Sequence, residues 1–366
     1  MKILQQLTFI KKIDWWLLTP VLFLIAFGLA TLYSGVLNIS NPDWTLFNKQ
    51  ITFFVLGLIF LLVASQLDYR FFRSFTVLLY IVAIILMIAV LFWGQTIRGT
   101  MGWFQFLGFS FQPVELSKFA LVVILAHLYA RRTGKEKKIT TILLVLIATL
   151  IPVALAIQQP DLGSAFVLLG IGGGFLGLLS IKPQQLIFII IVGILLGSIL
   201  WNAILLDYQK ERVLNFIDPM RDPLGRGYNV RQSIIAVGAG QLIGRGLGLG
   251  TQSQLRFLPE TSTDFIFANI AESLGFLGAS AIIILLIIIF FRMIILMRNT
   301  KDEFSTYLIY GFGLIFFIHA VINIGMNIGI MPVTGISLPF VSYGGSFLLM
   351  CMVAIGIIES IAIRQK

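Results

Sequence analysis

The chain has 366 residues, of which 58% are hydrophobic and only 11% charged, and its formal net charge is +10. Because a soluble globular protein carries about 25% charged residues, this composition excludes a soluble domain and indicates a polytopic membrane protein. Cys351 is the only cysteine, so a disulfide within the chain is excluded and a thiolate metal site has no support.

Apolar runs of about 17 to 25 residues, the length that crosses a bilayer as a helix, recur along the chain. Ten are predicted, at residues 15–34, 48–67, 74–93, 114–130, 139–157, 164–180, 185–206, 265–292, 304–330 and 343–363. Barrel strands would be shorter and would alternate in polarity, so we predict an all-α fold in one domain over residues 1–366. The first run is too long for a signal-peptide core and is predicted to remain as the first helix.

Basic residues are unevenly distributed between alternate loops. With the N-terminus inside, the inner loops and tails are rich in Lys and Arg, whereas the short outer loops hold only Lys49 and Arg98. This asymmetry places both termini in the cytoplasm and explains the positive charge without nucleic acid. The aromatic outer loop at residues 94–112 is predicted to dip into the membrane interface.

Two opposite charges lie inside the fourth predicted span. Pro113 suits the first turn of a helix, and it places Glu115 and Lys118 three residues apart on one face. One charge at the bilayer centre costs about 2.5 to 3.5 kcal/mol on insertion scales, so the two should pair or line a wet cavity. A neutralising ion pair that locks helices together and a site for an anionic substrate both explain the pattern. The only histidines, His127 and His319, give little support to a metal site.

Asp161 lies in the outer turn between the fifth and sixth spans, within residues 159–163. An Asp that follows Pro160 and precedes a Gly is commonly a turn former. Because this turn is predicted on the same side of the membrane as Asp264, Asp161 is also a candidate site residue.

The large outer loop, residues 207–263, is the longest predicted extramembrane segment. It holds seven basic residues, namely Lys210, Arg212, Arg221, Arg226, Arg231, Arg245 and Arg256. Basic residues are normally scarce on the outer side, so the loop predicts a bound anionic group, with pyrophosphate as the candidate. Residues 234–242 are predicted as a short helix along the outer leaflet. No phosphate-binding loop or dinucleotide fingerprint is present, so ATP use is not expected.

Asp264 follows this loop at the predicted start of the eighth span. A hydroxyl residue within 261–263 is predicted to cap that helix, with Asp264 in its first turn, where the helix dipole favours a carboxylate. Glu272, two helical turns further on, either faces the same cavity or packs against another helix. The Asn- and Gly-rich residues 323–346 predict broken backbone that lines a pocket.

Together these polar blocks resemble the SEDS (shape, elongation, division and sporulation) family. The resemblance is carried, in the family's order, by residues 111–118, 159–163, 222–233, 258–267 and 325–346. It implies a peptidoglycan glycosyltransferase that polymerises lipid II at the outer face of the cytoplasmic membrane during cell elongation. The implied partners are a class B penicillin-binding protein, as transpeptidase, and other membrane proteins of the elongation complex. The short N-terminal tail and residues 263–267 favour the RodA branch over the FtsW branch.

The resemblance also implies roles for particular residues. Asp264 corresponds to the family's essential acid, and we expect it to act as general base in an inverting transfer from a polyprenyl pyrophosphate donor. The expected substrate-binding residues are Glu115, Lys118, Asp161, Arg221, Arg226, Gln232, Ser233 and Arg256. No metal ligand is predicted, and a need for Mg²⁺ or Mn²⁺ stays open. Gly102 stands where many members carry Arg, so a phosphate contact from that position is in doubt.

A transporter is the second hypothesis. A lipid II flippase or an ion-coupled carrier could use Glu115, Lys118 and Glu272 as a relay, because intramembrane charges and broken helices also suit transport. No internal repeat is evident, and the charged loop lies on one side only, which favours the transferase. A non-catalytic scaffold for the cell-wall machinery is the third hypothesis.

Overall fold

Long apolar helices make up most of the computed structural model, which describes residues 12–37, 43–97, 99–106, 109–131, 138–179, 226–250 and 257–365, with isolated positions between 191 and 252. Within these residues eight helices are long and apolar enough to cross a membrane. They are α2 (Trp15–Leu37), α3 (Thr45–Gln66), α5 (Thr76–Trp93), α6 (Pro113–Ala130), α7 (Lys138–Gln158), α13 (Ile266–Asn299), α14 (Glu303–Asn327) and α15 (Gly345–Gln365). The predicted polytopic helical fold is therefore confirmed.

The remaining helices are shorter. The sixth predicted span is observed as the 16-residue α8 (Leu162–Gly177), and the seventh, at 185–206, lies almost entirely outside the described residues. Two further helices are α4 (Arg70–Ser74) and α11 (Arg226–Ala239), and α11 overlaps the helix predicted within the large outer loop.

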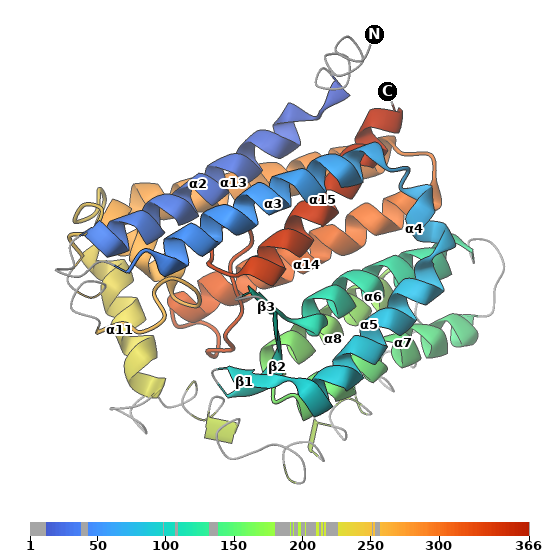
Figure 1. Cartoon of the computed structure of the whole chain (residues 1–366), viewed down its shortest axis with the longest axis horizontal. Helices are drawn as coiled ribbons and strands as arrows, with labels where there is room; N and C mark the ends of the chain where they lie inside the picture. The colour runs from blue at the N-terminus through green and yellow to red at the C-terminus, as the bar shows by residue number, and fades with distance from the viewer. Residues whose placement is uncertain are drawn as a thin grey trace.

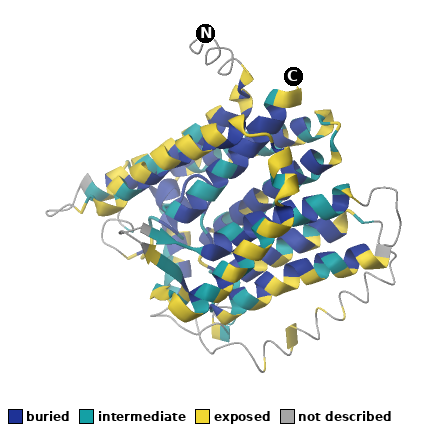
Figure 2. Cartoon of the chain, turned by 45° about the vertical axis from the view of Figure 1, so that its right-hand side comes forward, coloured by how far each residue is buried: buried dark blue, intermediate teal, exposed yellow. Residues whose placement is uncertain are grey.

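The helices form two groups joined through α14 and α6 (Figure 1). In one group α2 packs against α13, and α3 packs against α15; in the other, α5, α7 and α8 surround α6. Large apolar side chains remain exposed on outward faces, as on α5 at Val77, Leu78, Ile81 and Ile85 (Figure 2). Such faces suit contact with lipid, while the opposite faces form the shared core.

A small antiparallel sheet forms in the outer loop between α5 and α6, where the sequence prediction had no strands. Its strands are β1 (Gln95–Ile97), β2 (Thr100–Phe106) and β3 (Phe109–Phe111), in the order β1-β2-β3. Ser346, at the start of α15, holds β3 in place: its Oγ donates to the Ser110 carbonyl at 2.9 Å and accepts from the Gln112 amide at 3.2 Å.

A second difference lies inside α13, which the sequence predicted simply as one span over residues 265–292. At Gly275 the backbone adopts φ 66° and ψ −162° and breaks the helix. Residues 241–246 satisfy the backbone groups on both sides of the break. Before it, the Glu272 and Ser273 carbonyls accept from the Arg245 and Gly246 amides, respectively. After it, the Phe276 and Leu277 amides donate to the Gln241 and Leu242 carbonyls, respectively. At membrane depth a broken helix is tolerated where protein supplies the missing partners, so part of the large outer loop completes α13.

The start of α13 also corrects a prediction. The helix begins at Ile266, its N-cap Phe265 offers no side-chain hydrogen bond, and Asp264 lies in the preceding turn rather than in the first turn. A residue from another helix supplies the cap: Asn327, the last residue of α14, accepts from the Ala268 amide at 3.0 Å. A sequence pattern that searches only adjacent residues does not find a cap of this kind.

Asn327 joins three helices through one buried side chain and its own carbonyl. Its Nδ2 donates to the Asp264 carbonyl at 3.0 Å and to the Asn323 carbonyl at 2.8 Å. Ser233, on α11, donates from Oγ to the Asn327 carbonyl at 2.8 Å. The turn that carries Asp264 is thus attached to α14 through its backbone.

We expect Asn327→Leu, which keeps the side-chain volume, to lower the apparent melting temperature of the purified protein. The Ala268 amide would lose its cap, and one unsatisfied buried polar group costs about 1–3 kcal/mol. Asn48→Leu, at an exposed position on α3, is the matched control and should leave the melting temperature unchanged. Equal melting temperatures for both variants would contradict the capping role.

Candidate active site

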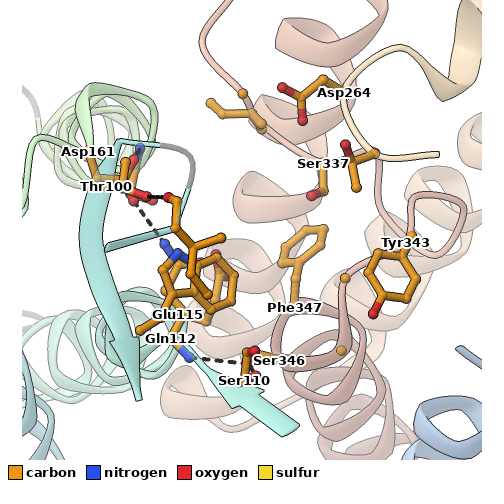
Figure 3. A pocket seen from close by; sticks show the side chains of 18 of the residues that line it. Thr100, Ser110, Gln112, Glu115, Asp161, Asp264, Ser337, Tyr343, Ser346 and Phe347 are labelled. Carbon is orange, nitrogen blue, oxygen red and sulfur yellow. Dashed lines mark hydrogen bonds between the residues drawn. The ribbon is translucent and has the colours of Figure 1, made fainter. Parts of the chain in front are cut away.

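A cavity of about 390 Å³ opens where the sheet, the first turns of α6 and α8, the middle of α14 and the connection from α14 to α15 meet (Figure 3). Its acidic and basic lining residues are Lys49, Glu115, Lys118, Asp161, Glu260, Asp264 and His319. Asp264 and Asp161 come from opposite walls, as Figure 3 shows. Asp264, Asp161 and the pair Glu115 and Lys118, which come from separate segments of the sequence, therefore line one cavity.

Asp264 occupies a turn that other segments fix on both sides. Its carbonyl accepts from the Asn323 amide side chain at 3.1 Å as well as from Asn327. The carboxylate is partly exposed and faces Gly335, where an added Cβ would lie 3.5 Å from Oδ2. Gly335 has φ +75°, a conformation that side chains disfavour, so a glycine here leaves the approach to the carboxylate open.

The connection between α14 and α15, residues 328–344, has the broken backbone that its sequence predicted, and residues 334–337 and 343–344 line the cavity. Ser342 Oγ donates to the Thr263 carbonyl at 2.7 Å, and the Tyr343 amide donates to the Ser262 carbonyl at 2.9 Å. These bonds hold the connection against the turn that carries Asp264.

Glu115 and Lys118 form the predicted pair, with 2.7 Å between Lys118 Nζ and Glu115 Oε1. The side chains are only 9% and 3% exposed, yet both line the cavity. Both residues belong to α6, but Lys118 Nζ also lies 3.2 Å from His319 Nε2 on α14, so the pair also connects two helices, as one of the two interpretations expected. The geometry makes it an ion pair and a part of the cavity wall at once.

His319, on α14, is the cavity residue whose role the sequence did not predict. Its Nε2 lies 3.2 Å from Lys118 Nζ, and its Nδ1 lies 3.0 Å from the Ser337 carbonyl. His319, Asn323 and Asn327 are spaced by four residues and all are buried; we call them the polar stripe of α14. That spacing places them on one helical face and was the available sequence signal.

Asp161 caps a helix and also lines the cavity. Its Oδ1 accepts from the Ser164 amide at 2.9 Å and so caps α8, while its Oδ2 accepts from Gln112 Nε2 at 3.0 Å at the cavity wall. Gly102, on β2, lies nearby: an added Cβ would stand 3.5 Å from Gln159 Oε1. A larger residue at this position would therefore point toward the wall that Asp161 and Gln112 share.

Other predicted residues lie away from this cavity. Glu272 is fully buried, and its Oε1 accepts from the Gln252 amide at 2.8 Å, so it supports the outer loop instead of facing Asp264's cavity. Ser233 is buried against Asn327, and neither it nor Gln232 lines the cavity. The remaining candidates, Arg221, Arg256 and the side chain of Arg226, lie outside the described residues. Lys49, which served only as a topology signal, does line the cavity.

The described residues do not form a recognisable metal site. No group of three or more His, Cys, Asp or Glu residues is placed there to hold a metal ion. His127 packs edge-on against Phe304, away from the cavity residues.

Comparison with known proteins shows the family of the chain. The sequence profile of the FtsW, RodA and SpoVE family, described as cell cycle protein, matches residues 14–366. Peptidoglycan glycosyltransferase MrdB of Escherichia coli K12 is 38% identical over 353 residues, which cover 95% of this chain and 94% of that protein.

Solved structures share the fold. A chain from a peptidoglycan synthase complex, in work on the coordination of polymerization and crosslinking, matches with a TM-score of 0.81 and 28% identity and covers 96% of this chain and 98% of that one. The crystal structure of rod shape determining protein RodA from Thermus thermophilus matches with a TM-score of 0.70 and 26% identity, covering 96% of each chain. The chain therefore belongs to the SEDS family of polytopic membrane proteins, the family of FtsW and RodA.

Proposed function

We propose that this protein is a peptidoglycan glycosyltransferase that polymerises lipid II into glycan strands during cell elongation. The observation that carries the proposal is the cavity itself, where a partly exposed carboxylate, Asp264, shares one space with two ammonium groups, Lys49 and Lys118. A base and separate cationic donors are the parts that transfer of a sugar from a pyrophosphate requires. The similarity to peptidoglycan glycosyltransferase MrdB supports this reaction class.

In the proposed reaction Asp264 accepts the proton of the acceptor sugar's 4-hydroxyl as that oxygen attacks the anomeric carbon of the donor. The bond from this carbon to the phosphate oxygen breaks, and the polyprenyl pyrophosphate leaves with the electron pair, so the anomeric centre inverts. Lys49 and Lys118 donate hydrogen bonds to the pyrophosphate as its charge grows. Lys118 acts in a buried setting, where an electrostatic interaction is stronger than in water.

The cavity size limits what it holds. About 390 Å³ lies in the lower part of the range of small-ligand pockets, roughly 300–1,000 Å³. It suits the pyrophosphate and the adjoining sugar, while the lipid tail and the peptide stay outside. The exposed apolar helix faces are suitable for the tail. The binding roles of Glu115 and Asp161 are to orient Lys118 and Gln112 at this wall.

The remaining parts of the proposal concern location and partners. We place the protein in the cytoplasmic membrane with both termini inside and the cavity at the outer face. Figure 1 supports this, because the chain ends lie on one side and the sheet and α11 lie toward the other. A class B penicillin-binding protein is the proposed partner, supported by the similarity to a chain of a complex that joins polymerization and crosslinking. Other elongation-complex membrane proteins are further proposed partners.

One of the three residues in the hypothetical transport relay, Glu272, lies away from the other two. Glu272 is bound to the Gln252 amide and does not line the cavity with Glu115 and Lys118. Lipid II flipping by the reconstituted protein, in the absence of polymer, would favour transport over transfer.

We expect Asp264→Asn to abolish polymerisation of lipid II by the purified protein with its transpeptidase partner. A general base contributes roughly 10²- to 10⁴-fold, and the amide keeps the shape while it removes the basic oxygen. Glycan product on gels measures the rate. Asp68→Asn, at an exposed position far from the cavity, should retain full activity. If the Asp264 variant polymerises lipid II and Glu260→Gln does not, the general base is Glu260, the other carboxylate of this turn, and the assignment of Asp264 is wrong.

A double substitution separates the structural and substrate roles of the ion pair on α6. Lys118→Met leaves Glu115 buried without its partner, and a broken buried pair costs about 3–5 kcal/mol. The combined Glu115→Gln and Lys118→Met variant removes both charges and should recover the melting temperature but not polymerisation. If the double variant polymerises lipid II at the native rate, Lys118 does not act on the leaving group.

A further inference from the structure

Lys118 is held by two residues from different helices. Its Nζ lies 2.7 Å from Glu115 Oε1 and 3.2 Å from His319 Nε2. His319 is itself fixed in two ways: its ring stacks on Phe347 with 4.2 Å between centroids and an interplanar angle of 15°, and Nδ1 lies 3.0 Å from the Ser337 carbonyl. All five residues line the cavity.

These partners determine the protonation of the imidazole. A carbonyl oxygen only accepts, so Nδ1 carries the hydrogen that it donates to Ser337. An ammonium group only donates, so Nε2 must present its lone pair to Lys118. Both contacts are satisfied at once by a neutral His319 with its hydrogen on Nδ1, and not by the other tautomer or by the imidazolium ion.

The same contacts orient Lys118. An ammonium group has three N–H donors, and among the described residues the structure assigns one to Glu115 and one to His319. The third is available to the cavity, which Lys118 lines. Without the acceptor on α14, Glu115 of the same helix would be the one hydrogen-bond partner left at the tip of the lysine among the described residues, beside the Phe347 ring, whose centroid lies 5.6 Å from Nζ.

From this geometry we propose that His319 is a positioning residue, which acts as a neutral acceptor at Nε2 and directs the Lys118 ammonium group at the leaving pyrophosphate. This inference rests on the proposed function, because the task of Lys118 is assigned there. His319 does not itself touch the reacting atoms. It sets how well Lys118 stabilises charge in the transition state, so the effect should fall on kcat more than on KM.

Two substitutions test the two contacts of His319, to Lys118 and to Ser337, separately. In His319→Gln the side-chain amide reaches the place of Nε2 and can accept from Lys118, whereas in His319→Asn it reaches the place of Nδ1 and can donate only to Ser337. We expect the Gln variant to retain most of the native kcat for lipid II. We expect the Asn variant to lose roughly 10- to 100-fold, the usual effect of one lost hydrogen bond to a charged group, with melting temperatures measured for both.

Each pattern of activity is decisive for folded variants. Higher activity in the Gln variant supports the proposal. Higher activity in the Asn variant would show that anchoring of Ser337 is what matters and would overturn it. Equal activities, whether both retained or both lost, would overturn it as well, because the acceptor would then be unnecessary or the aromatic ring itself essential.

A spectroscopic test needs neither variant to fold nor any activity. The chain has only two histidines, so ¹⁵N-histidine labelling gives two imidazoles, and His127→Gln identifies the signals of His319. At neutral pH we expect a protonated Nδ1 and an unprotonated Nε2 for His319. An Nε2–H tautomer or an imidazolium would overturn the proposal.

The two measurements also separate this inference from the proposed function. Failure of the native protein to polymerise lipid II would reject the function and leave the tautomer result standing. Native polymerisation together with the wrong tautomer would reject only the role of His319.

Discussion

The polar stripe of α14 is the constraint on which the site depends. Backbone groups at membrane depth must find partners within the protein, and the amides of Asn323 and Asn327 supply them for irregular segments on either side. Asn323 donates to the carbonyls of Asp264 and Ile336, and Asn327 adds the cap of α13. One regular helix therefore fixes both the turn that carries the carboxylate and the connection that faces it. A site held on a rigid element can keep its geometry better than one held by loops alone.

The charged residues of the cavity lie in two different environments. Asp264 lies in a turn with access to water, whereas Glu115 and Lys118 are buried in the first turns of α6. A base that must exchange its proton benefits from the first setting. A cation that stabilises a leaving group benefits from the second, because the low dielectric strengthens its attraction for developing charge. In the proposed transfer, with Asp264 as the base and Lys118 as the cation, each position thus suits a different part of the same reaction.

Irregular backbone occurs in two forms in the described residues. The connection from α14 to α15 gives up helical structure to line the cavity, and α13 is broken at Gly275. Backbone hydrogen bonds from residues 241–246 satisfy the groups left unpaired at that break. In addition, Glu272 accepts from the Gln252 amide. The described part of the large outer loop is therefore built into the membrane domain. Glu272 of α13 stabilises the contact between this helix and the loop. This structural role accounts for a buried carboxylate that does not line the cavity.

The membrane class, most spans and the pair on α6 follow from the sequence, which also predicts Asp264 as a site residue. Hydrophobic length, helical spacing and the scarcity of intramembrane charge are local properties, and local properties can be read along the chain. The contacts between these residues and their partners follow only from how the helices pack. The cap of α13 comes from Asn327, residues 241–246 complete a broken helix, and His319 reaches Lys118 across 201 positions of sequence. Hydrogen bonds between remote segments depend on how helices pack, and no local pattern specifies that packing.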